Sequence, residues 1–90
     1  MLDYNSEIQK EIEKEIERAE TIYGRFASGH EFIAVLQEEI DELWANIRAV
    51  GYPSLDELVQ VAAIATRALR QYAEGGPGKF EDERRGLFDE

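Results

Sequence analysis

Apolar residues recur every three or four positions along most of the chain, which is the spacing of amphipathic helices. Over residues 7–23 the apolar stripe consists of Ile8, Ile12, Ile16, Ala19, Ile22 and Tyr23. Over residues 29–50 it consists of Phe32, Leu36, Ile40, Leu43 and Ile47. Over residues 54–74 it consists of Leu58, Val61, Ala62, Ala65, Leu69 and Tyr72. No segment reads as a strand, so the pattern predicts an all-α fold.

Short polar residues and glycines mark the ends of these helices. Three serines have a Glu or Gln three positions later, as in a capping box: Ser6 with Gln9, Ser28 with Glu31, and Ser54 with Glu57. Gly51 is a C-terminal stop for the second helix, and Gly-Gly-Pro-Gly at 75–78 ends the third. The chain therefore divides into a helical domain, residues 1–74, and a Gly/Pro break with a C-terminal tail or short helix, residues 75–90.

The connection between the second and third helices is short, which makes them antiparallel neighbours. Ninety residues form one domain at most, and a domain of this size buries only a modest core. The long apolar stripe of the first helix independently favours a partner helix. We therefore expect an antiparallel helical bundle of three main helices, completed by self-association.

Charge and cysteine content narrow the class of protein. Twenty acidic and ten basic residues give a formal charge of −10, which disfavours binding to nucleic acid or to an anionic membrane. The absence of cysteine excludes disulfides and thiolate metal sites and fits a reducing compartment. No apolar run approaches the roughly 20 residues that span a bilayer, and the N-terminus lacks signal-peptide features. These features predict a cytoplasmic location.

Five residues on the second and third helices form a candidate cation site. Glu38, Glu39 and Glu42 lie along one edge of the second helix, where Glu39 borders the apolar flank. The antiparallel hairpin places Glu57, on the first turn of the third helix, and its neighbour Gln60, three residues later, opposite this edge. Like charges at such spacing repel each other, whereas a hard cation such as Mg²⁺ prefers oxygen ligands.

The same residues carry a family resemblance. Residues 38–42 (EEIDE) match an E-E-x-x-E motif, and residues 57–60 (ELVQ) stand at the spacing of a following E-x-x-D motif. Over residues 28–72 the chain resembles short, phage-like members of the MazG-like all-α nucleoside triphosphate pyrophosphohydrolases. The resemblance implies hydrolysis of a nucleoside triphosphate to the monophosphate and pyrophosphate, with Mg²⁺ or Mn²⁺ as the cofactor. It also implies a homo-oligomer, either a dimer or a tetramer.

The resemblance also implies roles for individual residues. It makes Glu38 a ligand or the residue that orients the attacking water, and it gives four metal ligands: Glu39, Glu42, Glu57 and Gln60. Gln60 stands where the family has an Asp, so it adds no charge, and weaker metal binding with reduced or lost catalysis follows. Asp41 and Asp56 are spare carboxylates. The alternatives are a catalytically inactive MazG-like module for interaction or nucleotide binding, and a purely structural helical oligomer.

Each candidate ligand also has a structural interpretation. Glu57 suits a capping box and the positive end of a helix. Glu39 needs a partner beside the core seam, which Asn46 or a cation supplies. Glu38 and Glu42 also suit a solvated face, and Gln60 suits a hydrogen-bonding position at the boundary of the core.

Trp44 and Arg67 are candidate substrate contacts. Trp44 either packs as a core or interface residue or stacks on a nucleobase. Arg67, like Arg48 and Arg70, either meets phosphates or pairs with the acidic surface. The one histidine, His30, makes a poor zinc site.

Overall fold

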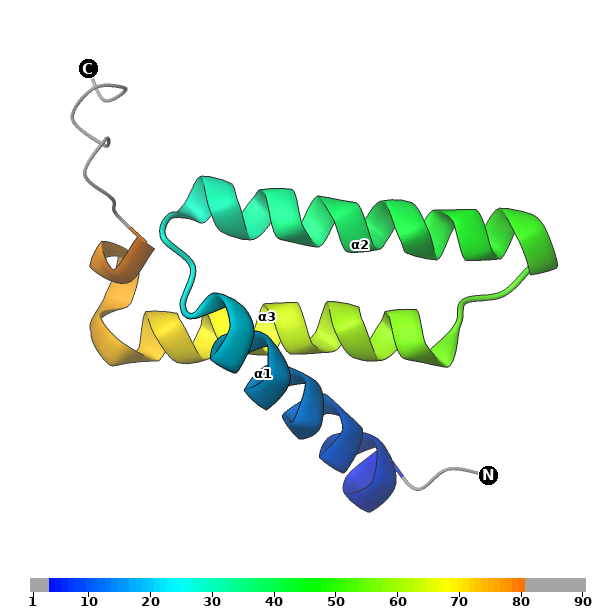
Figure 1. The fold of residues 1–90 in the computed structure, drawn as a ribbon, viewed down its shortest axis with the longest axis horizontal. Coiled ribbons are helices and arrows are strands. Elements are labelled where there is room, and N and C mark those ends of the chain that lie inside the picture. Colours follow the sequence, from blue (N-terminus) through cyan, green and yellow to red (C-terminus); the bar gives the residue numbers. More distant parts are fainter. Residues whose placement is uncertain (1–3, 81–90) are drawn as a thin grey trace.

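A computed structural model describes residues 4–80 of the chain and contains three long helices (Figure 1). They are α1 (Gln9–Tyr23), α2 (Gly29–Val50) and α3 (Leu55–Gly75). A π-helical turn, η1 (Tyr4–Ile8), precedes α1, and a 3-10 turn, η2 (Gly76–Phe80), follows α3. The described part of the chain contains no strand, so the all-α prediction is confirmed.

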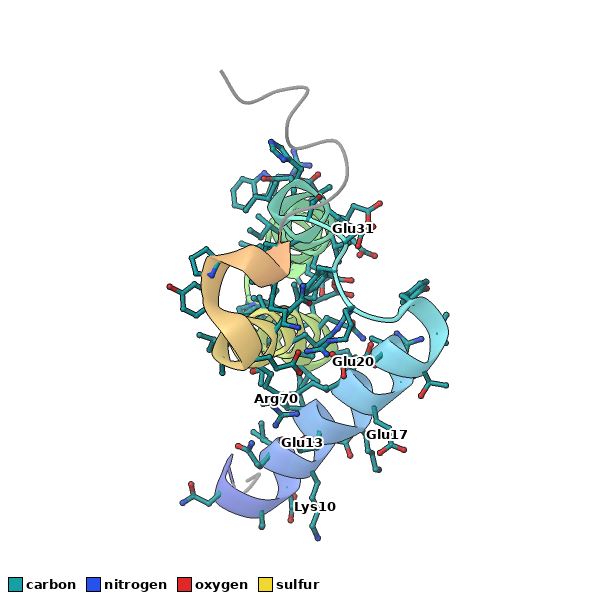
Figure 2. The ribbon with its side chains drawn as sticks, turned by 90° about the vertical axis from the view of Figure 1, so that its left-hand side faces the viewer. Lys10, Glu13, Glu17, Glu20, Glu31 and Arg70 are labelled. Atoms are coloured by element: carbon teal, nitrogen blue, oxygen red, sulfur yellow. The ribbon has the colours of Figure 1, made fainter. Side chains whose placement is uncertain are left out.

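Helix α3 lies between the other two helices. Figure 1 shows α2 and α3 side by side and antiparallel, as predicted, with α1 crossing α3 obliquely. The end-on view in Figure 2 shows the order α2, α3, α1. Because α1 packs on α3 and not along α2, the three helices form a hairpin with a third helix across one side.

The capping predictions hold for α2 and α3. Ser28 Oγ accepts a hydrogen bond from Glu31 N at 3.1 Å, and Ser54 Oγ accepts one from Glu57 N at 3.2 Å. Each bond satisfies an amide that the first helical turn leaves free. Gly51 ends α2 in the left-handed conformation, with φ of 88°, which a glycine adopts without steric cost.

The capping prediction for α1 is wrong. Ser6 lies inside the π-helical turn. The N-cap position of α1 belongs to Ile8, whose apolar side chain makes no capping hydrogen bond. The backbone of Ile8 is itself helical, with φ of −70° and ψ of −39°. An N-cap serine has an extended backbone, whereas the π-helical turn of η1 keeps the backbone before α1 helical.

The core lies where α1 meets α3. Ile12 and Ile16 of α1 pack with Ala63 of α3, which confirms the centre of the stripe predicted for the first helix. Ile22 and Tyr23, at the end of the same stripe, are exposed.

The predicted stripe of α3 is confirmed only in part: Ala62 packs against the core and Val61 is half-buried, but its other members are exposed. The residues that α3 buries are Ala63, Ile64, Arg67 and Gln71, whereas Leu69 of the predicted stripe is 69% exposed. Helix α1 packs over Ala63, whose small side chain permits close approach. Helix α2 has no fully buried residue. Self-association over these exposed faces stays a prediction.

The side chain of Gln71, on α3, holds two segments in place: the connection before α2 and the turn η2 after α3. This side chain is only 3% exposed, and its amide pairs with the Phe26 backbone through bonds of 3.0 Å from Phe26 N and 2.8 Å to Phe26 O. The same amide donates to Lys79 O at 2.7 Å. The break after Gly75 is confirmed, and the segment to Phe80 docks as a short helical turn; residues 81–90 lie outside the described part.

Replacing Ser54 with alanine tests how the start of α3 is held. Loss of the cap is expected to lower the free energy of unfolding by about 1 kcal/mol, because Glu57 N loses its acceptor. Chemical denaturation followed by circular dichroism measures the change. Thr21→Ala, at an exposed position of α1, is the matched control and is expected to change stability by less than about 0.5 kcal/mol. Equal effects of the two substitutions would contradict the capping role.

Candidate metal centre

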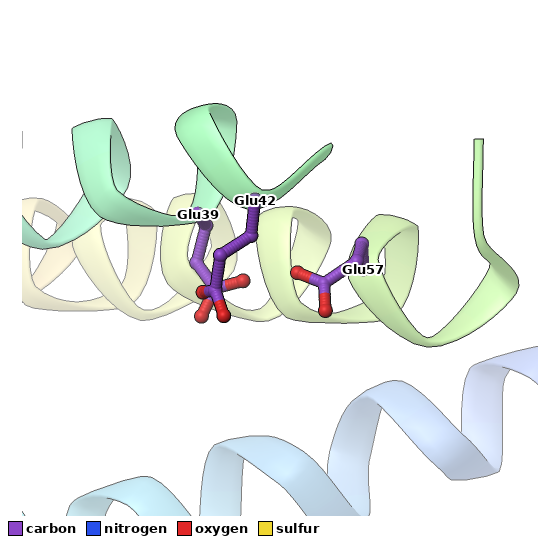
Figure 3. Close-up of side chains that lie close together, drawn as sticks. All are labelled: Glu39, Glu42 and Glu57. Atoms are coloured by element: carbon purple, nitrogen blue, oxygen red, sulfur yellow. The ribbon is translucent and has the colours of Figure 1, made fainter. Parts of the chain in front are cut away.

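Three carboxylates from the two acidic motifs converge between α2 and α3. Glu39 and Glu42 extend from α2, and Glu57 reaches toward them from the first turn of α3 (Figure 3). One oxygen of each side chain lies within 4.8 Å of one oxygen of the other two. We call these three residues the carboxylate cluster.

The positions of these residues follow from local structure. Glu39 and Glu42 are three residues apart on one helix, so their side chains are neighbours on the same side of α2. Glu57 is held opposite by the Ser54 cap and the short connection from Gly51. The backbone N–H of Glu57 makes the capping bond to Ser54, whereas its carboxylate lies in the cluster.

Burial and like charge act on Glu39. Burial is the largest influence, and it raises the pKa of Glu39 to about 7. The hydrogen bond to Glu57 and the negative charges of Glu42, Glu57 and Glu15 raise this pKa further. In the absence of a positive partner, Glu39 therefore holds a proton up to neutral pH.

Two oxygens of the cluster lack hydrogen-bond partners. Glu39 Oε2 and Glu57 Oε2 are buried, and neither forms a hydrogen bond within residues 4–80. Asn46 thus does not satisfy Glu39 Oε2. Buried oxygens without partners are costly, and a cation would satisfy both. An all-oxygen, all-carboxylate set is the donor chemistry that Mg²⁺ and Mn²⁺ accept, so the residues fit such an ion.

Glu38 and Gln60 lie beside the cluster and outside it. Both line a cleft of about 390 Å³ between α1, α2 and α3, which Glu39 also lines. Glu38 is exposed, whereas Gln60 is half-buried and its amide faces Glu15 of α1. Of the spare acids, Asp41 accepts a hydrogen bond from Gln37 Nε2 at 3.1 Å and is not part of the cluster.

Glu15 is the acidic residue that the sequence analysis missed. Its side chain is 13% exposed and lines the cleft with Glu39 and Gln60. A hydrogen bond from Arg18 is the main cause that lowers the pKa of Glu15, and the Gln60 amide contributes less. The available signal was its position three residues after Ile12 and four before Ala19, which puts it on the border of the buried stripe.

The candidate substrate contacts Trp44 and Arg67 lie in different surroundings. Trp44 is 54% exposed, so it does not pack in the core of this chain, and the Arg48 guanidinium lies 5.5 Å from its ring centre. Arg70 Nη2 donates to Glu13 Oε2 at 2.6 Å across α1 and α3 (Figure 2). Of Arg48, Arg67 and Arg70, it is Arg67 that lines the same cleft as Glu39.

Comparison with known proteins adds no relative. No family model matches the chain, and no curated protein or solved structure shows significant similarity to it. Within residues 4–80, no helix has both the length and the apolar character needed to cross a membrane.

Proposed function

We propose that the protein is a Mg²⁺-dependent nucleoside triphosphate pyrophosphohydrolase of the MazG-like type, with Mn²⁺ as an alternative cofactor. The observation that carries the proposal is the convergence of Glu39, Glu42 and Glu57, from two motifs 15 residues or more apart in sequence, within 4.8 Å. The motif resemblance supplies the reaction type, and the two unpartnered buried oxygens support a cation at this place.

In the proposed reaction the cluster residues hold the cation through their carboxylate oxygens. A divalent cation there neutralises phosphate charge and makes a water molecule more acidic. Glu38, exposed at the cleft, orients the attacking water and accepts its proton. The water oxygen bonds to phosphorus, the bond between the α- and β-phosphates breaks, and nucleoside monophosphate and pyrophosphate leave.

Release of pyrophosphate from a panel of common and modified nucleoside triphosphates tests this function. Turnover of at least one triphosphate is expected with Mg²⁺ or Mn²⁺, and none with EDTA. The absence of turnover across the panel with either metal would rule out the enzyme. Metal-dependent nucleotide binding without turnover, measured by calorimetry, would instead identify a catalytically inactive binding module.

Gln60 is the observation that favours the second candidate function, a catalytically inactive nucleotide-binding module. Its amide lies beside Glu15 and brings no charge, where the resemblance expects an aspartate. Gln60→Asp is expected to raise Mg²⁺ affinity by about tenfold, since it adds a negative charge beside the cluster, where the resemblance expects a metal-binding aspartate. Calorimetric titration with MgCl₂ measures the change. Gln9→Asp, at an exposed position of α1, adds the same charge far from α2 and is the control. An equal gain in both variants would place Gln60 outside the metal site.

A further inference from the structure

The cleft that contains Glu39 continues along α3 beyond the carboxylate cluster. Helices α1, α2 and α3 and the connection before α2 line it, and it encloses about 390 Å³. On α3 it runs from Gln60 to Arg67, seven residues that span about 10 Å of helix. One end of the cleft therefore lies at the metal centre and the other at Arg67.

Three arginines line this cleft, and two of them are engaged by carboxylates. Arg18 donates to Glu15, with its Nε 3.0 Å from Glu15 Oε1, and Arg25 pairs with Glu74. The third is Arg67, which is only 5% exposed.

Arg67 is buried with a donor that no acceptor satisfies. Its Nη2 donates to Gly24 O at 3.0 Å, and its guanidinium carbon lies 4.4 Å from the ring centre of Phe26. Its Nε is buried and has no hydrogen-bond partner within the described residues. Glu20 Oε2, at 3.9 Å, attracts the charge but is too distant for a hydrogen bond. A buried N–H of this kind is costly, and an anion that enters the cleft would satisfy it.

We propose that the guanidinium of Arg67 binds the terminal phosphate of a triphosphate chain whose other end lies at the carboxylate cluster. This inference rests on the proposed function and extends it to the substrate. A phosphate oxygen forms a shorter, charge-assisted hydrogen bond with Arg67 Nε than the distant Glu20 provides. Glu20, at the surface, turns away into solvent.

The charges that line the cleft make binding of a polyphosphate depend on the metal. Four glutamates and three arginines line it, so the cleft has no net positive charge to attract a polyphosphate. A divalent cation at the cluster offsets two of the negative charges at that end of the cleft. Binding at Arg67 therefore requires the metal, and it favours triphosphates over monophosphates because a monophosphate does not reach from the metal to Arg67.

Nuclear magnetic resonance of the full chain tests the proposal directly. The Nε–H resonance of Arg67 is expected to shift on titration with inorganic tripolyphosphate in the presence of Mg²⁺, and to stay in place with Mg²⁺ alone or with inorganic phosphate. The Nε–H of Arg48, beside Trp44, is the internal control. An Arg67 resonance that does not move at saturating tripolyphosphate and Mg²⁺ would overturn the proposal.

A conservative substitution gives the second measurement. Arg67→Lys keeps the charge and removes the Nε donor, and is expected to weaken tripolyphosphate binding by tenfold or more while Mg²⁺ affinity changes less than twofold. Arg70→Lys is the matched control on the exposed side of α3. Unchanged tripolyphosphate affinity in a folded Arg67→Lys protein would refute the role of Arg67.

The two hypotheses fail in different ways. Hydrolysis of a triphosphate with an unresponsive Arg67 resonance would refute this inference and leave the enzyme standing. A responsive Arg67 without turnover of any triphosphate would support the anion site and refute the enzyme.

Discussion

The Glu39→Gln variant is expected to lose metal-dependent pyrophosphate release by at least about 100-fold and, without metal, to be more stable than the parent chain. The loss follows because Glu39 contributes an oxygen to the cluster. Even the removal of a residue that only hydrogen-bonds to a metal ligand lowers metal affinity or activity by about 10- to 100-fold. The gain follows because the glutamine removes a buried carboxylate that burial and neighbouring acids disfavour. Steady-state kinetics and thermal unfolding with and without Mg²⁺ measure the two effects.

Glu17→Gln is the matched control for this substitution. Glu17 is exposed on α1 (Figure 2) and the change removes the same charge, so activity and the stabilisation by Mg²⁺ are both expected to remain. A Glu39→Gln protein that still gains stability from Mg²⁺ as the parent does would contradict the metal centre. A Glu39→Gln protein less stable than the parent without metal would contradict the burial of a disfavoured charge.

Magnesium affinity is expected to fall about tenfold between pH 8 and pH 6. With its pKa raised to about 7, Glu39 is mostly ionised at pH 8 and mostly protonated at pH 6, so protons compete with the cation. Calorimetric titration with MgCl₂ at several pH values measures this. An affinity that stays constant across this range would show that the ion does not displace a proton from Glu39.

Stability without metal is expected to change with pH in the opposite sense. Between the ordinary carboxyl value of 4.5 and about 7, the folded state holds a proton on Glu39 that the unfolded chain has released. The contribution of this group to folding stability therefore falls as the pH rises through that window and is unfavourable above it. Denaturant unfolding in EDTA at pH 5 and pH 8, in parent and Glu39→Gln proteins, isolates the contribution. Identical pH dependence in the two proteins would exclude it.

The sequence located the carboxylate cluster because helical geometry and one short connection were enough. Glu39 and Glu42 share a side of α2 through their spacing alone, and the Gly51–Ser54 connection turns α3 back so that Glu57 faces them. The chemistry proposed for these positions comes from the motif resemblance. That resemblance did not supply Glu15, which comes from a helix outside both motifs.

Sequence patterning was weakest for the faces of α3. The large residues of its predicted stripe, Leu58, Leu69 and Tyr72, are exposed. Arg67 and Gln71, which are polar, are buried instead. Polar residues enter this face because α1 and the connection before α2 cover it and offer backbone groups, such as Gly24 O and Phe26 O, as partners. No periodicity rule identifies such partners in advance.

The sequence by itself determined the three helices, two of their caps and the pairing of α2 with α3, because each depends on neighbours within a few residues or on one tight connection. Only the tertiary structure decided the oblique crossing of α1, and with it the burial of Arg67 and the approach of Glu15 to Glu39 and Gln60. The physical reason is that a crossing depends on which side chains fit closely, here around Ala63, and this is a property of two surfaces that no single stripe encodes.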